Sequence, residues 1–393
     1  MAKRRGNQEG AIYQKDNGRW QAQFSIDGKR FSKSFSSRKE CVNWLREMAN
    51  QKDQGLTARG VDLTFEEFFE KWLLLIEPRV RHKTWLQYKG IGNYHLLPKF
   101  GKVKLADLKP VAIQDFYAEK LKGGLGARSV QLLHGVLRSS LGFAERQGLI
   151  PYSPTRRVDK PTFRPPEMKF LSDVQVRSLL LTTEGSWLGM VLQMAVTTGM
   201  RQGELLGLRW SDVDWASATV LVRRQLQRIP YKGLVFSEPK SRSGIRTVQL
   251  GRLTLRKLMQ YREQQEARFA LGENKENLLF PSSDGTPKEP RVLLAQFKAA
   301  LKAAGLPEMR FHDLRHTAAS LMLMSGMELI RIARQLGHSK PSITLDIYGH
   351  LIPGLANESA ERLDELVAPL TAADLQQQAP KPVFKGENSI IYP

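Results

Sequence analysis

The sequence predicts an α+β protein that is mostly helical, because two kinds of pattern divide it. Residues 11–36 alternate between apolar and polar side chains, as a small β-sheet does when one face is buried. Most of the remainder repeats apolar residues at helical spacing, with strand-like stretches near 218–223, 233–238 and 245–250. We therefore expect a three-stranded sheet with a helix, then a helical domain, then a mainly helical domain with a small antiparallel sheet and hairpin.

Turn residues support the amino-terminal sheet. Asp-Asn-Gly at 16–18 and Asp-Gly at 27–28 flank a strand whose apolar side chains all face one way. A helix after Ser36 and Ser37 would cover that apolar face with Cys41, Trp44, Leu45 and Met48. The polar face would remain free to enter a major groove, or it is simply solvated. Its candidate contacts to nucleic acid are Arg19, Gln21, Gln23 and Lys33.

A helical block follows from residue 62. Thr64 and Glu67 form a capping box that opens a helix rich in Phe and Trp. Further helices are expected at 82–95, 110–122 and 127–147, with breaks at Pro98, Gly101, Pro110 and Gly123-Gly124. Basic residues gather between positions 79 and 104, and Lys83 is one of them. They fit either a surface that grips phosphates or an ordinary solvated helix face.

Composition changes along the chain predict its division into domains. Five prolines lie between residues 151 and 166, which is typical of an extended linker. In the carboxy-terminal tail, which begins at residue 356, the net charge becomes negative and leucines recur at helical spacing. This tail would dock on its own domain or on a neighbouring subunit. The expected parts are an amino-terminal domain at 1–60, a helical domain at 62–155, a linker at 156–169, a larger domain at 170–355 and a tail at 356–393.

Overall composition indicates a nucleic-acid partner. The 393 residues include 60 Lys and Arg against 39 Asp and Glu, a net charge of +21 that is expected of a polyanion binder. A generally basic, soluble surface is the alternative. No stretch is apolar enough for a membrane span or a secretory signal, and Cys41 is the only cysteine. The sequence thus predicts a cytoplasmic protein without an internal disulfide or a cysteine-rich zinc module.

Six polar residues supply what is needed to break a phosphodiester without a metal or another cofactor. They combine cations for phosphate charge, groups that carry protons and a hydroxyl nucleophile. These candidates are Arg201, Lys240, His312, Arg315, His338 and Tyr348. Each has a structural alternative: Arg201, for example, would pair with Glu204 one turn away. His312 and His316, four residues apart, also have a spacing that binds zinc, but no clear third ligand accompanies them.

The motifs around these residues resemble those of the tyrosine recombinase (phage integrase) family. They are TTGMRQGELLGLRWSDVD at 197–214, Pro239-Lys240, HDLRHT at 312–317, LGHS at 336–339 and DIYGH around Tyr348. The resemblance covers the whole chain. It implies an arm-binding domain at the amino terminus, then a core-binding domain at 62–155, and a catalytic domain from residue 170.

The resemblance also implies roles for residues. Tyr348 would attack the scissile phosphate to form a 3′-phosphotyrosine, Arg201 and Arg315 would hold the phosphate, and Lys240 would protonate the leaving oxygen. His312 would act as the base, His338 would contact the phosphate or the nucleophile, and Glu204 would orient the site. Arg242 and Arg246, close to Lys240, would bind DNA phosphates, or all three residues belong to a flexible basic loop.

The activity implied is integration and excision of a mobile element. Its setting would be the nucleoid of a bacterial cytoplasm, where a homotetramer acts on double-stranded core-type and arm-type sites with possible accessory DNA-bending and directionality proteins. A catalytically silent DNA-binding regulator and a type IB topoisomerase are the alternatives.

Overall fold

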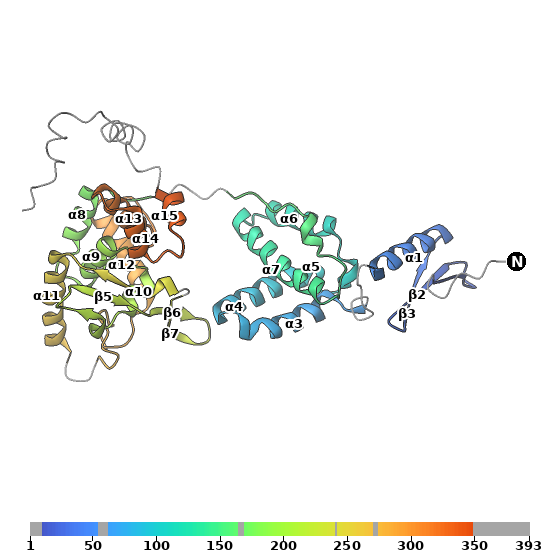
Figure 1. Cartoon of the computed structure of the whole chain (residues 1–393), viewed down its shortest axis with the longest axis horizontal. Helices are drawn as coiled ribbons and strands as arrows, with labels where there is room; N and C mark the ends of the chain where they lie inside the picture. Colours follow the sequence, from blue (N-terminus) through green and yellow to red (C-terminus); the bar gives the residue numbers. More distant parts are fainter. Residues whose placement is uncertain (1–9, 54–61, 164–168, 240–241, 270–273, 349–393) are drawn as a thin grey trace, which may run out of the picture. The chain divides into compact units, whose positions relative to one another are not determined.

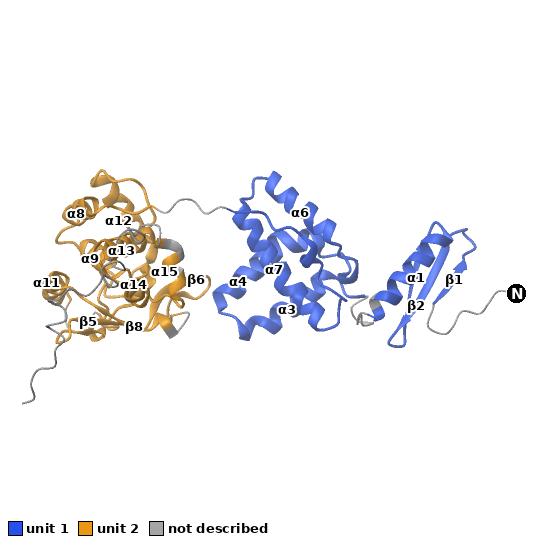
Figure 2. Ribbon diagram, turned by 45° about the horizontal axis from the view of Figure 1, so that its top comes forward, with its two compact units in different colours: residues 1–166 blue, residues 167–393 orange. Residues whose placement is uncertain are grey.

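The computed structural model describes residues 10–53, 62–163, 169–239, 242–269 and 274–348. The chain divides into two compact units, residues 1–166 and residues 167–393 (Figure 2). Within the described ranges, the first unit holds two separate hydrophobic cores, and the second holds a large core with a smaller one. None of the helices in these ranges is long and apolar enough to cross a lipid bilayer.

Three antiparallel strands in the order β1-β2-β3 open the first unit. They are β1 (Ala11–Gln14), β2 (Trp20–Ile26) and β3 (Lys29–Phe35), and helix α1 (Arg38–Asp53) packs on them (Figure 1). The apolar side of β2 faces the helix, as its alternation predicts. The core they share consists of Ala22, Phe24, Ile26, Phe31, Cys41, Leu45 and Met48. The predicted sheet and its covering helix are confirmed.

The rest of the first unit is a helical bundle. Thr64 caps α3 and forms the predicted capping box with Glu67. The regular helices are α3 (Phe65–Ile76), α4 (His82–Ile91), α5 (Leu97–Phe100), α6 (Pro110–Lys122) and α7 (Ala127–Arg146). Short 3-10 turns are η1 (Glu77–Arg79), η3 (Leu105–Asp107) and η4 (Pro154–Arg157).

The break expected at Pro98 is wrong. A π-helical turn, η2 (Gly92–Leu96), joins α4 to α5, and the helical path continues to Phe100. Pro98 lies in the first turn of α5, where a helix tolerates a residue without an N–H donor.

The proline-rich segment keeps contact with the bundle over its first half. Val158 belongs to the bundle core, and the Gln131 side chain donates to the Pro161 carbonyl at 2.8 Å. The side chain of Gln114 accepts a hydrogen bond from the backbone N–H of Asp159 at 3.0 Å. The division into a core-binding domain and a linker from residue 156 remains a prediction.

The second unit surrounds a small sheet and a hairpin with helices. The sheet has the order β4-β5-β8, formed by β4 (Val213–Asp214), β5 (Thr219–Val222) and β8 (Arg246–Gln249). The hairpin consists of β6 (Gln225–Ile229) and β7 (Gly233–Ser237). The three predicted strand segments correspond to β5, β7 and β8. The antiparallel sheet and hairpin predicted for this part are confirmed.

Some helices of the second unit precede the sheet in the sequence, and others follow it. They are α8 (Asp173–Thr182), α9 (Trp187–Thr198), α10 (Gln202–Gly207), α11 (Arg252–Arg268), α12 (Pro290–Ala303), α13 (Asp313–Met324), α14 (Leu329–Leu336) and α15 (Pro341–Tyr348). Two 3-10 turns, η5 (Trp210–Asp212) and η6 (Arg242–Gly244), complete it.

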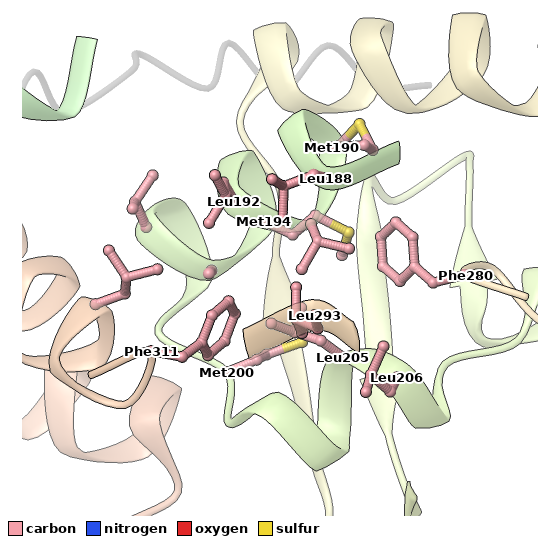
Figure 3. Close-up of a cluster of buried hydrophobic side chains, with 14 of the residues drawn as sticks. Leu188, Met190, Leu192, Met194, Met200, Leu205, Leu206, Phe280, Leu293 and Phe311 are labelled. Atoms are coloured by element: carbon pink, nitrogen blue, oxygen red, sulfur yellow. The ribbon is translucent and has the colours of Figure 1, made fainter. Parts of the chain in front are cut away.

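The large core of this unit fixes the ends of the segments that lead to the candidate site (Figure 3). Met200 and Phe311 are buried, and they directly precede Arg201 and His312 in the chain. Their burial anchors the backbone next to these two residues, because well-packed apolar side chains have little freedom to move. Side chains of α9, including Leu192 and Met194, fill the centre of this core.

Candidate active site

Five of the six predicted catalytic residues lie in the described part of the second unit. Arg201 directly precedes α10, His312 directly precedes α13, and Arg315 lies in the first turn of α13. His338 follows the end of α14, and Tyr348 ends α15. Helices α13, α14 and α15 lie side by side (Figures 1 and 2). Lys240, between β7 and β8, lies outside the described residues.

Arg315 connects three of these segments. Its buried guanidinium donates to the Gly199 carbonyl at 2.8 Å and to the Leu336 carbonyl at 2.6 Å. The first carbonyl lies two residues before Arg201, and the second lies two residues before His338. Burial, with Arg201 as the next cause, lowers the pKa of Arg315, but a guanidinium remains charged at neutral pH. A fixed positive charge therefore lies where the segments meet.

Glu204 is the buried carboxylate of the site, and only 2% of its side chain is exposed. It accepts hydrogen bonds from the Arg201 backbone N–H at 2.9 Å and from the Arg201 guanidinium at 2.8 Å. Its other partner is the Arg246 guanidinium at 2.9 Å. Burial alone would raise the pKa of Glu204, but the hydrogen bond and charge of Arg246, and then Arg201, hold it below its ordinary value. Glu204 is therefore ionised at neutral pH.

Arg246, predicted as a DNA contact, is buried and bonds within the protein. Its side chain is 6% exposed, and it also donates to the Gln335 carbonyl at 2.6 Å and to the Gly244 carbonyl at 3.2 Å. All three guanidinium nitrogens thus bond to protein groups, and a contact of Arg246 with a DNA phosphate remains a prediction. Arg246 connects Glu204 to the end of α14.

Arg201 remains partly open to solvent although it pairs with Glu204. Its side chain is 38% exposed, and one of its two terminal nitrogens makes the ion pair. The ion pair that the spacing of Arg201 and Glu204 predicts as an alternative is thus present, and part of the Arg201 side chain remains accessible to solvent. Both features fit a cation that its carboxylate orients towards an incoming anion.

The histidines of the site are neutral at pH 7. Burial, followed by the charges of His316 and Arg315, lowers the pKa of His312 to about 4, although part of its side chain stays exposed. Burial and the nearby Arg315 and Arg201 lower the pKa of His338 to about 4. The Nδ1 atom of His338 lies 2.8 Å from the Thr344 hydroxyl, within α15.

Tyr348 is almost fully buried, with 2% of its surface exposed. Its ring packs in the smaller core with apolar side chains of α13 and α14, including Ala319, Ile332 and Leu336. Its hydroxyl lies 2.7 Å from Nδ1 of His316. Burial raises the pKa of this phenol to about 12, and the charge of Arg315 opposes that rise. The phenol is therefore protonated and requires a base before it can attack.

Comparison with known proteins places these motifs in a family. The phage integrase family model matches residues 169–353, and the model described as phage integrase, N-terminal SAM-like domain, matches residues 64–121. The tyrosine recombinase XerD of Pseudomonas aeruginosa is 30% identical over 246 residues, which cover 61% of this chain and 76% of that protein. The chain belongs to the phage integrase family of tyrosine recombinases.

Longer matches support the same membership. A putative prophage phiRv2 integrase of Mycobacterium tuberculosis is 29% identical over 93% of this tyrosine recombinase and 97% of the relative. The ICEBs1 integrase of Bacillus subtilis is 26% identical over 90% of this chain and 98% of the relative.

The recombinase also shares its fold with solved structures. A Tn1549 transposon integrase in complex with a circular intermediate DNA has a TM-score of 0.64 at 20% identity, over 78% of this chain and all of that one. A lambda integrase tetramer bound to a Holliday junction has a TM-score of 0.55 at 18% identity, over 88% of this chain and 96% of that one. The mostly helical fold with small antiparallel sheets, predicted from the sequence, is confirmed.

The remaining predicted contacts lie away from this cluster in the chain. Arg19, Lys33 and Lys83 are exposed, and Gln21 and Gln23 are half-buried on β2. Gln23 donates to the Tyr13 hydroxyl at 2.9 Å. The side chain of Arg242 lies outside the described residues. The role of these residues in DNA binding remains a prediction.

Two residues of the recombinase site have contacts that the sequence did not reveal. The sequence placed His316 four residues after His312, a spacing that can bind zinc, and in the structure His316 contacts the candidate nucleophile. No group of three or more His, Cys, Asp or Glu side chains that could hold a metal occurs in the described ranges. Arg246 was assigned to DNA. The spacing of four residues between His312 and His316 was the available signal for His316.

Proposed function

We propose that this tyrosine recombinase integrates and excises a mobile DNA element by cutting and rejoining strands through a 3′-phosphotyrosine, without a metal. The main support is the position of Tyr348, whose hydroxyl lies within the cluster of histidines and arginines of its own chain. Relatives named as integrases of a prophage and of ICEBs1 support the type of element.

In this proposal the two arginines hold the scissile phosphate. Arg201 and Arg315 donate to its nonbridging oxygens, which gain charge as the phosphorus becomes five-coordinate. Each preorganised donor of this kind contributes roughly 3 to 4 kcal/mol to the transition state. His312 and His338, both neutral, hydrogen-bond the phosphate or relay protons beside it. Glu204 orients Arg201 through their hydrogen bond, and Arg246 holds Glu204 in place.

The reaction conserves the energy of the phosphodiester. The phenolic oxygen of Tyr348 bonds to phosphorus as the bond to the 5′-oxygen breaks. Lys240 donates a proton to that departing oxygen, and a base of the site takes the phenolic proton. The 5′-hydroxyl of the same strand or of another strand then reverses the step, so no ATP is consumed. Exchange between two duplexes requires four cuts, and hence four subunits.

Each part of the chain would then have a separate task. Residues 1–60 bind arm-type DNA sites through the polar sheet face, and residues 62–155 bind core-type sites. Residues 156–169 link them to the catalytic domain at 170–355, and the tail at 356–393 docks in cis or on a neighbour. Accessory DNA-bending and directionality proteins, and a bacterial cytoplasm, complete the proposed setting. The lambda integrase tetramer on a Holliday junction supports the assembly by analogy.

A suicide substrate tests the proposal. The protein is incubated in a chelator with DNA that carries its cognate site and a nick next to the scissile phosphate, and covalent adducts are counted after denaturation. We expect an adduct that Tyr348→Phe abolishes while DNA binding persists. Binding without an adduct would indicate the silent regulator. Relaxation of any supercoiled plasmid, regardless of site, would indicate a topoisomerase.

A further inference from the structure

The ring of His316 makes a hydrogen bond with the hydroxyl of Tyr348. The two rings come from α13 and α15, with centroids 5.8 Å apart, and Nδ1 lies 2.7 Å from the hydroxyl. Within the described residues, this is the one hydrogen bond of the Tyr348 hydroxyl. Burial raises the pKa of the phenol to about 12, so the hydroxyl carries its proton and can donate it.

Burial and nearby positive charges keep the ring of His316 neutral at pH 7. Burial lowers its pKa, Asp313 opposes this, and Arg315 and then Arg310 add to the lowering. Two further histidines face it: His312 packs edge-on with centroids 5.6 Å apart, and His338 lies within electrostatic range. In the neutral tautomer that carries its hydrogen on Nε2, an imidazole accepts a hydrogen bond at Nδ1. In that tautomer His316 accepts the hydrogen bond that the protonated phenol donates, and a base at this position requires the same tautomer.

We propose that His316 is the base that takes the phenolic proton when Tyr348 attacks the phosphate. The role rests on the proposed function and replaces the one that the sequence assigned to His312. As the bond from the phenolic oxygen to phosphorus forms, the proton moves to Nδ1 of His316, and the ring becomes an imidazolium. Reversal returns the proton to the phenol. A general base already within hydrogen-bond distance of its proton meets the first geometric requirement for this type of catalysis.

His312 fits this step less well. It directly precedes α13, and its contact within the described residues is with the His316 ring, not with the phenol. If His316 served only to pack against its neighbours, its ability to accept a proton would not matter, since an apolar ring would pack equally well. The two alternatives therefore differ in how the cleavage rate responds to pH and to added base.

The experiment measures single-turnover cleavage of the suicide substrate by the full-length protein from pH 5 to 9. In the wild type, protonation of His316 removes the base, so the rate should rise through an apparent pKa below 6.5 and then level off. His316→Asn should slow cleavage by about 10²- to 10⁴-fold and lose that rise. His312→Asn is the matched control and should retain the rise, even if it is slower. Added imidazole should restore part of the activity of His316→Ala.

Three results would overturn the assignment. One is cleavage by His316→Asn at the wild-type rate. Another is slow cleavage with the wild-type pH profile, and a third is His316→Ala without rescue although it is folded and binds DNA. These outcomes leave the proposed function intact, because the wild type still forms the adduct through Tyr348. If the wild type forms no adduct, both proposals fail together.

Discussion

Glu204 supplies the negative charge that three buried or half-buried arginines of the site share. It bonds directly to Arg201 and Arg246, and its charge also acts on Arg315. Without it these guanidiniums would repel one another in a region of low dielectric. Breaking a buried ion pair on one side is costly, since the partner charge remains buried and uncompensated.

Glu204→Gln should therefore lower the free energy of unfolding by about 3 to 5 kcal/mol at pH 7. The folded-state pKa of Glu204 lies below its unfolded value, so its stabilisation is present above the unfolded value and is lost as the pH falls through the folded one. The difference in the free energy of unfolding between Glu204→Gln and the wild type should therefore become smaller at acidic pH. Urea unfolding measures both effects.

Glu266→Gln is the control for this measurement. Glu266 pairs with Arg262 on the surface of α11 and is 62% exposed. A change of at most about 0.5 kcal/mol is expected there. Equal losses in the two variants would show that the buried charge has no special importance.

Site residues that belong to a short local motif could be predicted from the sequence. Site residues that are defined by contacts between distant parts of the chain were harder to predict. Arg201, His312, Arg315, His338 and Tyr348 came from short motifs, and the fold brings these motifs into one unit. The bond of His316 to Tyr348 spans 32 positions, and those of Arg246 span 42 and 89. No spacing rule within one helix or strand reveals partners at such separations.

At the scale of elements, the end of α14 controls where His338 lies. Gly337 ends this helix with φ of 70°, a left-handed conformation that side chains disfavour. A Cβ atom added there would lie 2.8 Å from the Ser243 carbonyl oxygen and 3.0 Å from Nη1 of Arg246. This close approach connects the segment before β8 to the turn that carries His338.

Gly337→Ala should thus destabilise the fold and slow DNA cleavage, because the turn must move away from Arg246. The control is Gly326→Ala at the end of α13, where φ is 80° and no atom lies within 4 Å of the added Cβ. The control should lose only about 1 to 2 kcal/mol, the cost of the left-handed backbone. Thermal unfolding and adduct formation are measured for both. Equal cleavage rates would contradict the steric account.

The elements that the sequence missed carry weak patterns. β4 has two residues, and β6 has the sequence QLQRI with a single fully buried side chain, Leu226. Hairpin pairing with β7, rather than burial of an apolar face, defines β6. The long helices and the amino-terminal sheet were predictable because periodic apolar residues fill their cores.

At the scale of the whole molecule, the amino-terminal sheet and the helical bundle have separate cores within the first unit. This separation suits a chain that binds two kinds of DNA site. Removal of residues 1–60 should leave cleavage of an isolated core site within a few fold of the wild-type rate and impair integration that needs arm sites. Both activities are compared on matched substrates. Equal loss of the two would argue against a separate arm-binding domain.

The nucleophile is tested most directly by locating the residue that becomes covalently bonded to DNA. The adduct formed on a suicide substrate is digested with nuclease and protease, and the modified peptide is sequenced by mass spectrometry. We predict a 3′-phosphodeoxynucleotide on Tyr348 and on no other residue. A nucleotide attached to another side chain, or an adduct that persists in Tyr348→Phe, would contradict the assignment of this phenol as the nucleophile.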